Sequence, residues 1–166
     1  MSNPPPISRS ATRTSLLLLL IALSAFALDQ FTKLLIVRSL VPGQSSEVIP
    51  NLLTWTFVQN RRGAYGLFGD HAGVLIILAL CVLILFAFLF RELTGNSLSA
   101  TIAFGCIVGG ALGNIVDRVH YHYVVDFISV TPLPIFEVFN VADTCVSLGV
   151  VTLIVTNIIE KRSSRS

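Results

Sequence analysis

A cluster of polar side chains lies in the second half of an otherwise apolar chain. It contains three carboxylates, two amides and one guanidinium: Asp117, Asp126, Asp143, Asn114, Asn140 and Arg118. Charged groups are costly next to hydrocarbon, and those that persist among apolar helices commonly serve a function. The cluster is therefore the first candidate for a functional site.

Asp126 and Asp143 are the members of this cluster best suited to acid–base chemistry. Asp126 lies in the apolar run Val-Val-Asp-Phe-Ile, where a carboxylate without a partner is expensive to bury. Two carboxylates in an apolar site can share one proton, because neighbouring like charges do not both ionise. The ionised member can take a proton from an attacking water, and the protonated member can donate to the carbonyl oxygen or the leaving amine. This pair predicts aspartic peptide hydrolysis, which needs no metal or other cofactor.

Other roles for the same residues stay open. Asn140 could cap a helix, and Asp143 could favour the dipole of that helix, because both lie at the start of an apolar run. Asp117 is a competing third carboxylate. The adjacent Arg118 favours a charged Asp117 with a structural or headgroup-binding role.

Two further classes of membrane protein also stay open. A zinc-dependent membrane hydrolase could take His120, His122 and Asp126 as ligands, with His71 as a possible further one, although the chain contains no His-Glu-x-x-His motif. A small transporter or proton-relay protein could use Asp29, Lys33 and Asp126 as a pathway. The transporter interpretation predicts polar groups at mid-membrane and an inverted repeat, whereas the polar groups here cluster toward one end of the expected helices.

The composition indicates an integral membrane protein with a single domain. Hydrophobic residues make up 54% of the 166 residues and charged residues 12%, against about 25% charged residues in a soluble domain. The net charge of +2 is too small to indicate nucleic-acid binding. We therefore expect membrane lipid rather than nucleic acid around the protein. We also expect the chain to act as a monomer.

Four apolar runs approach the roughly 20 residues that a membrane-spanning helix needs. They cover residues 15–37, 72–90, 98–115 and 141–159. Gly105, Gly109 and Gly113 recur at every fourth residue of the third run, and small residues at this spacing let another helix approach closely. The sequence therefore predicts a mainly α-helical fold with four transmembrane helices.

The two connections on one side of the membrane are predicted to carry the remaining structure. Residues 41–70 contain a Pro-Gly turn signal and a run rich in β-branched and aromatic residues, which favours a small extracytoplasmic β-sheet arm. Residues 119–138 contain Pro132 and Pro134, which exclude a continuous helix. Their apolar side chains predict a short extracytoplasmic amphipathic segment at the membrane interface.

The number of spans places both termini on one side of the membrane. That side carries slightly more of the lysines and arginines, which indicates cytoplasmic termini and a site near the extracytoplasmic face. The predicted organisation is a disordered cytoplasmic tail over residues 1–14, one membrane domain over residues 15–160, and a cytoplasmic tail over residues 161–166.

Asp29 and Lys33 lie inside the first apolar run. Their i, i+4 spacing places them on one helix face with the acid first, the favourable order for an ion pair. The pair could be purely structural or could line a polar site. Arg9 and Arg13 before a leucine-rich core, with residues 25–27 (Ala-Phe-Ala) after it, also fit a cleavable signal peptide, although apolar residues continue past that point.

Five stretches of this chain resemble the bacterial lipoprotein signal peptidase family, also called type II signal peptidase. They are residues 29–33, 60–68, 109–118, 124–128 and 139–143. Each motif alone is modest, but five in this order at these spacings are highly specific. The resemblance implies an aspartic endopeptidase of the inner membrane that cuts diacylglyceryl-modified prolipoproteins just before the lipid-bearing cysteine.

The resemblance also implies a role for individual residues. The catalytic pair falls on Asp126 and Asp143. Residues that bind substrate or position the pair fall on Asn60, Asn114, Arg118 and Asn140, and structural polar residues on Asp29, Lys33 and Asp117. It implies too that the first run is retained, because cleavage after Ala27 would discard most of a helix that the site needs. One departure is Arg62, which stands where the family's Asn-x-Gly-Ala-Ala-Phe motif has its glycine.

Overall fold

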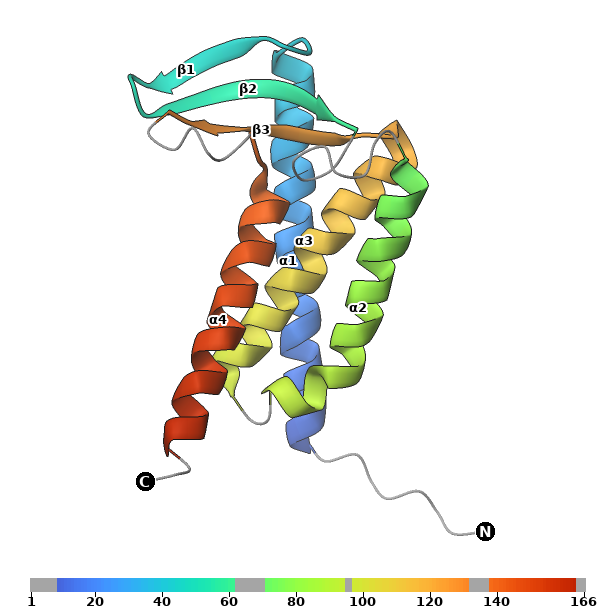
Figure 1. Ribbon diagram of the computed structural model, residues 1–166, viewed down its shortest axis with the longest axis vertical. Helices are drawn as coiled ribbons and strands as arrows, with labels where there is room; N and C mark the ends of the chain where they lie inside the picture. Colours follow the sequence, from blue (N-terminus) through green and yellow to red (C-terminus); the bar gives the residue numbers. More distant parts are fainter. Residues whose placement is uncertain (1–8, 62–70, 95–96, 132–137, 164–166) are drawn as a thin grey trace.

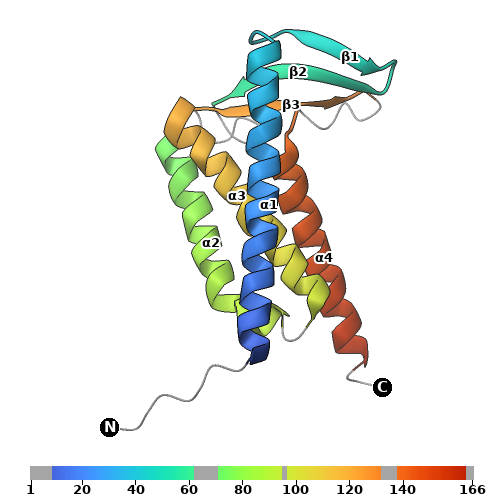
Figure 2. The same ribbon diagram turned by 180° about the vertical axis from the view of Figure 1, so that it is seen from behind.

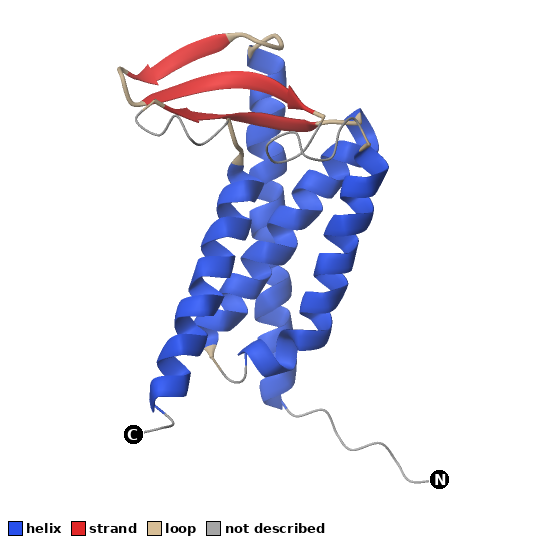
Figure 3. Cartoon of the chain, viewed as in Figure 1, coloured by secondary structure: helices blue, strands red, loops and turns tan. Residues whose placement is uncertain are grey.

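The computed structural model describes residues 9–61, 71–94, 97–131 and 138–163. Within these ranges the helices are α1 (Arg9–Ser39), α2 (Ala72–Thr94), α3 (Leu98–Tyr121) and α4 (Val141–Ser163). The strands are β1 (Ser45–Ile49), β2 (Leu53–Asn60) and β3 (Val124–Val130). The helices run side by side, and the strands form a sheet across one end of the bundle. That end is opposite to the one where α1 begins and α4 ends (Figures 1 and 3).

Three of the described helices are long and apolar enough to cross a membrane. The qualifying segments are Thr12–Ser39, Leu98–Tyr121 and Val141–Ile159, and α2 contributes a shorter apolar stretch, Gly73–Phe88. Large apolar side chains on the outside of the bundle are exposed, such as Phe31 and Phe88, as expected for surfaces that face lipid. The chain is therefore a mainly helical membrane protein with three candidate spans, and the fourth span remains a prediction.

Helix α3 packs against both α1 and α4 and approaches them through small residues (Figures 1 and 2). The predicted glycine ridge faces α1. A Cβ atom added to Gly105 would overlap Ile21, and one added to Gly109 would overlap the carbonyl oxygen of Ala22. Gly110 makes a similar close approach to α4. The ridge therefore brings helix backbones close together, as predicted from the glycine spacing.

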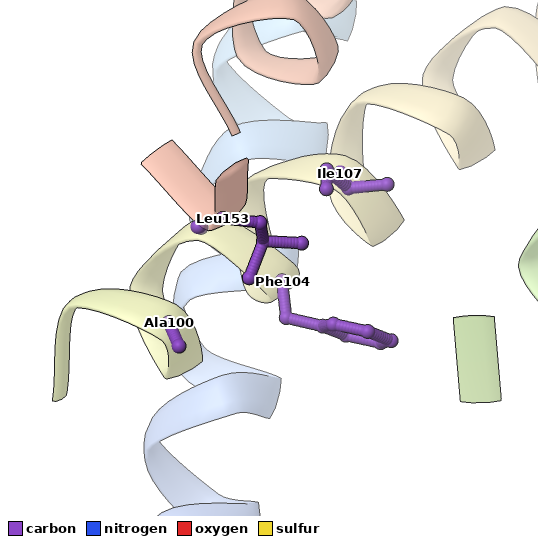
Figure 4. Close-up of a cluster of buried hydrophobic side chains, with 5 residues drawn as sticks. Ala100, Phe104, Ile107 and Leu153 are labelled. Atoms are coloured by element: carbon purple, nitrogen blue, oxygen red, sulfur yellow. The ribbon is translucent and has the colours of Figure 1, made fainter. Parts of the chain in front are cut away.

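A cluster of apolar side chains joins the same helices nearer the end where α4 finishes. It contains Ala100, Phe104 and Ile107 of α3 together with Leu153 of α4, all of them buried. Figure 4 shows Phe104 pointing away from Leu153 toward α2. The Phe104 ring lies 5.7 Å from the ring of Phe86 in α2. Helix α2 is thus attached to the bundle mainly through α3.

The sheet is antiparallel, with β2 between β1 and β3. Its register pairs Val58 with Asp126 and Asn60 with Val124. A second apolar cluster, which includes Ile36 of α1, Phe57 of β2, and Val125 and Phe127 of β3, fastens the sheet to the end of α1.

Strand β3 corrects the prediction of an amphipathic segment over residues 119–138. Residues 124–130 instead form a strand that pairs with β2. The first four residues of the strand are all buried, so the alternation of apolar and polar residues that reveals a half-buried strand is absent. The predicted β-sheet arm therefore includes a strand from the second connection. Residues 132–137 of the predicted segment lie outside the described residues.

The helix boundaries also differ from those predicted. Helix α1 begins at Arg9, inside the predicted tail of residues 1–14, and α4 continues to Ser163. Helix α3 runs past residue 115 to Tyr121 and ends where His122 adopts a left-handed conformation with φ of 63°. The extension of α3 places Asp117 and Arg118 within the last turns of this helix.

The close approach of α1 to α3 predicts that Gly109→Ala destabilises the protein. The added methyl group meets backbone of α1, which cannot move without shifting a helix, and overpacking of this kind costs typically about 1–3 kcal/mol. We expect a lower melting temperature in detergent. Gly73→Ala is the matched control, because a Cβ atom there meets nothing within 4 Å. Equal melting temperatures for the two variants would contradict this account of the packing.

Candidate active site

Asn140 connects the two carboxylates that the sequence singled out. Asp126 comes from β3 and Asp143 from the first turn of α4. The Asn140 side chain donates from Nδ2 to Asp126 Oδ1 at 2.7 Å. Its backbone N–H donates to Asp143 Oδ2 at 3.3 Å. Both acids are therefore held by one residue that is completely buried.

The same residue begins helix α4. Asn140 immediately precedes Val141, and its Oδ1 accepts a hydrogen bond from the backbone N–H of Asp143 at 2.9 Å. Together with the bond from the Asn140 N–H to Asp143 Oδ2, this forms a reciprocal helix cap. The capping role considered for Asn140 and Asp143 is thus confirmed. It also fixes the position of Asp143.

Two more amides occupy the remaining carboxylate oxygens. Asn60, the last residue of β2, donates from Nδ2 to Asp126 Oδ2 at 2.8 Å. Asn114 of α3 donates from Nδ2 to Asp143 Oδ1 at 2.8 Å. Each oxygen of both acids therefore accepts a hydrogen bond from an asparagine. All three asparagines expected from the family resemblance lie at the pair.

Lys33 lies beside this group, buried within α1. Its Nζ contacts Asp29 Oδ2 at 2.8 Å, Asp117 Oδ2 at 2.9 Å and Asn114 Oδ1 at 2.9 Å. A lysine has three N–H donors, and here each has an acceptor. The ion pair of Asp29 and Lys33 predicted from the sequence is confirmed. Asp117 also contacts Lys33, which the sequence did not indicate.

Asp117 links the ion pair to the strand that carries Asp126. Its Oδ2 accepts from the backbone N–H of Val125 at 3.1 Å, one residue before Asp126. The side chain is only 1% exposed, so it is not placed to bind a lipid headgroup. The cation in contact with it is Lys33, not Arg118 as expected from the sequence.

Arg118 turns back toward its own helix. Its Nη1 donates to the carbonyl oxygen of Asn114 at 3.2 Å. Its Nε is buried and has no hydrogen-bond partner among the described residues. The guanidinium also lies within electrostatic range of Asp126 and Asp143. Arg118 therefore brings an unused N–H donor close to the two acids.

Asp29 and Gln30 tie the first helix to the site. Asp29 Oδ1 accepts from the backbone N–H of Ala142 at 2.9 Å, which places a carboxylate at the positive end of α4. Gln30 donates from Nε2 to Asp117 Oδ1 at 3.0 Å and to the carbonyl oxygen of Gly113 at 3.2 Å. The role of Gln30 was missed, although an amide inside an apolar helix next to Asp29 was a usable signal.

Burial gives Asp126 unusual acid–base properties. The loss of solvent around its carboxyl group, reinforced by the negative charge of Asp143, raises the pKa of Asp126 to about 7. Hydrogen bonds from Asn60 and Asn140 and the charge of Lys33 oppose this rise in the pKa. Asp126 can therefore hold a proton near neutral pH while it lies close to a second acid.

Two of the histidines considered as zinc ligands lie outside this group. His120 and His122 are exposed at the end of α3, where His120 packs edge-on against Tyr121 and Tyr121 stacks on Tyr123. Across the parts of the chain that the structure describes, no three histidine, cysteine or acidic residues are grouped as metal ligands. Asn60 of the family motif is at the site, whereas Arg62 lies outside the described residues.

The fold and the site together define a helical membrane protein with acids and amides gathered under a small sheet at one end of the bundle. A family model described as signal peptidase (SPase) II matches residues 21–159. This chain belongs to the signal peptidase II family.

Individual relatives agree with the family match. A lipoprotein signal peptidase of Listeria monocytogenes serotype 4b (strain CLIP80459) is 34% identical over 147 residues, which cover 88% of this chain and 96% of the relative. One of Halothermothrix orenii is 35% identical over 135 residues, covering 81% and 90%.

Two solved structures, both described as bacterial membrane enzymes studied by the in meso method, share the fold. The first has a TM-score of 0.81 at 32% identity and covers 90% of this chain and 91% of its own. The second has a TM-score of 0.77 at 33% identity, with coverage of 84% and 90%. The arrangement of helices and sheet is therefore shared with known membrane enzymes.

Asp117 provides a test of which carboxylates do the chemistry. Asp117→Asn retains an oxygen for the Val125 N–H but removes a negative charge from Lys33. We expect a lower melting temperature and retained peptide cleavage. Because Lys33 keeps Asp29, the destabilisation is expected to stay below the roughly 3–5 kcal/mol that breaking a buried pair costs. Complete loss of cleavage in a folded variant would contradict a structural role for Asp117.

Proposed function

We propose that this protein is an aspartic endopeptidase of the bacterial inner membrane. Its reaction removes the signal peptide from diacylglyceryl-modified prolipoproteins by cutting on the N-terminal side of the lipidated cysteine. The observation that carries the aspartic mechanism is the pair Asp126 and Asp143, joined through Asn140. The family and the names of the relatives support the substrate class.

The mechanism follows from the different surroundings of the two acids. We assign the shared proton to Asp126, which is 2% exposed and has a pKa raised to about 7. We assign the negative charge to Asp143, which accepts a backbone N–H in the first turn of α4. Asp143 takes a proton from a water molecule as the water oxygen attacks the scissile carbonyl carbon, and Asp126 donates its proton to the carbonyl oxygen. When the tetrahedral intermediate collapses, a proton passes to the leaving nitrogen. The products are a signal peptide with a new carboxyl group and a lipoprotein with a free amino group on its lipidated cysteine.

The surrounding polar side chains hold this geometry. Asn60 and Asn140 fix both oxygens of Asp126, and Asn114 and Asn140 fix those of Asp143. Positioned groups of this kind reduce the reorganisation needed in the transition state. Arg118, with a buried and unpartnered Nε, is suited to donate a hydrogen bond to a carbonyl of the substrate chain.

The membrane placement of the site fits this substrate. We propose that α2 is the fourth span, that both termini are cytoplasmic, and that the sheet and the acid pair lie at the extracytoplasmic face. A diacylglyceryl group anchors the substrate cysteine in the outer part of the bilayer. The cleavage site would then reach the pair at the membrane surface, with one copy of the chain sufficient for the reaction and membrane lipid around it.

The central prediction concerns the two proposed catalytic acids. Asp126→Asn and Asp143→Asn each leave a side chain of the same shape that can still accept hydrogen bonds, but neither can exchange a proton. We expect each to lower the rate by at least about 10²-fold, the contribution typical of general acid–base catalysis. The measurement is cleavage of a diacylglyceryl precursor peptide by purified protein, followed by mass spectrometry, with melting temperatures to establish folding. A folded variant of either type with near wild-type cleavage would rule out the mechanism.

The pKa of Asp126 predicts a fall in activity on the alkaline side. Below about pH 7 Asp126 keeps its proton, and above it both acids are ionised, so the general acid is lost. Asn60→Ala removes a hydrogen bond that lowers the pKa of Asp126. The alkaline limb of the activity profile should therefore move to higher pH in this variant. Thr56 lies in the same strand as Asn60, and its exposed hydroxyl is hydrogen-bonded to Ser45 of β1. Thr56→Ala should leave the limb in place.

A further inference from the structure

Both ends of the Asn114 side chain are fixed. Its Oδ1 accepts from Lys33 Nζ at 2.9 Å and from Asn140 Nδ2 at 3.1 Å, and its Nδ2 donates to Asp143 Oδ1 at 2.8 Å. An ammonium group only donates and an ionised carboxylate only accepts. One orientation of the amide satisfies both neighbours, and the flipped orientation would set donor against donor and acceptor against acceptor.

We propose that Lys33 is a positioning residue that acts through Asn114 to keep Asp143 as the ionised member of the acid pair. This inference rests on the proposed aspartic mechanism. The ion pair with Asp29 indicates a structural role for Lys33. The proposal adds an effect on the ionisation of Asp143, although Lys33 itself takes no part in the bond cleavage.

The position of Lys33 is set by groups other than Asn114. Asp29 and Asp117 take two of its N–H donors, and the residue is only 3% exposed. The third N–H is thereby aimed at Asn114. Asn114 and Asp117 lie three residues apart on α3, a spacing that places both on one helix face, the face that meets Lys33.

The contacts of Asp143 favour its charged form over that of Asp126. Its two oxygens accept from Asn114 and from the backbone N–H of Asn140, and it lies in the first turn of α4, where the helix dipole favours an anion. Asp126 lies in a strand and has no such dipole. Among the described residues, the charged groups that act on Asp143 are Asp29 and Lys33 of α1, Arg118 of α3 and Asp126 of β3. Asp117 of α3 contacts Lys33.

The test is the acid limb of the activity profile, where Asp143 takes up a proton and stops acting as a base. Asn114→Ala removes the donor to Asp143 and leaves Lys33 paired with Asp29 and Asp117. We expect the acid limb to move to higher pH by about one unit, the order expected for one hydrogen bond to a charged group. Gln30→Ala is the matched control, since it removes a part-buried amide near the same site whose hydrogen bonds go to Asp29, Asp117 and Gly113 rather than to Asn114 or Asp143. It should lower the melting temperature without moving the acid limb.

A second comparison isolates Lys33. Lys33→Gln is combined with Asp117→Asn so that the net charge of the buried group does not change, and Asp117→Asn alone is the reference. The charge-balanced variant should move the acid limb in the same direction as Asn114→Ala. Adding Asn114→Ala to it should produce little further movement, because groups that act through one another are not additive.

The outcomes separate this proposal from the proposed function. One outcome is that Asp126→Asn and Asp143→Asn abolish cleavage while Asn114→Ala leaves the acid limb unmoved. The aspartic mechanism would then stand, and the proposed action of Lys33 through Asn114 would be wrong. Fully additive movements of the acid limb in the Lys33→Gln and Asn114→Ala variants would also overturn the proposal, because Lys33 would then act on Asp143 by its charge alone. If the charge-balanced variant does not fold, the deciding measurement is the position of the acid limb in Asn114→Ala compared with Gln30→Ala. Cleavage by the two aspartate variants would end both proposals.

Discussion

The structure depends on one buried lysine. Lys33 is held between Asp29 and Asp117 in a part of the bundle that water scarcely reaches, and such ions are expensive to bury unless every donor has a partner. The contacts that satisfy it connect α1 with α3, α4 and β3. Asp29 reaches the start of α4 through the Ala142 N–H, and Asp117 reaches β3 through the Val125 N–H. The two elements that carry the proposed acids are therefore anchored to the same cation.

Folding and chemistry share atoms at this site. The hydrogen bonds that begin α4 are the ones that orient Asp143, so the helix cannot start correctly without placing the acid. The close contact of Gly113 with the Asp29 carboxylate has a similar double function, because a larger residue there would push the acid away from Lys33. Stability measurements alone therefore do not separate structural residues from functional ones here, and pH profiles are needed.

Much of the site could be predicted from the sequence, because the types of its residues indicate the chemistry. Carboxylates and amides in an apolar chain stand out, and the i, i+4 spacing of Asp29 and Lys33 is enough to indicate an ion pair. The partnership of Lys33 with Asp117 could not be foreseen, since it joins helices far apart in sequence, and the adjacent Arg118 offered a nearer cation. Strand β3 was not predicted for a related reason. Its buried residues show no alternation of apolar and polar side chains, and its partner β2 is remote in the chain.

That missed strand is what makes the two acids different. Had residues 124–130 lain as an amphipathic segment in the interface, Asp126 would have been partly hydrated and its ordinary acidity retained. Pairing with β2 instead buries Asp126 and brings Asn60 to its carboxylate. Asp143, at the N-terminus of a helix, accepts the backbone N–H of Asn140 and lies in a favourable dipole. The two aspartates thus have different environments, because Asp126 lies on a strand and Asp143 at the end of a helix. Sharing one proton between two acids requires such an asymmetry.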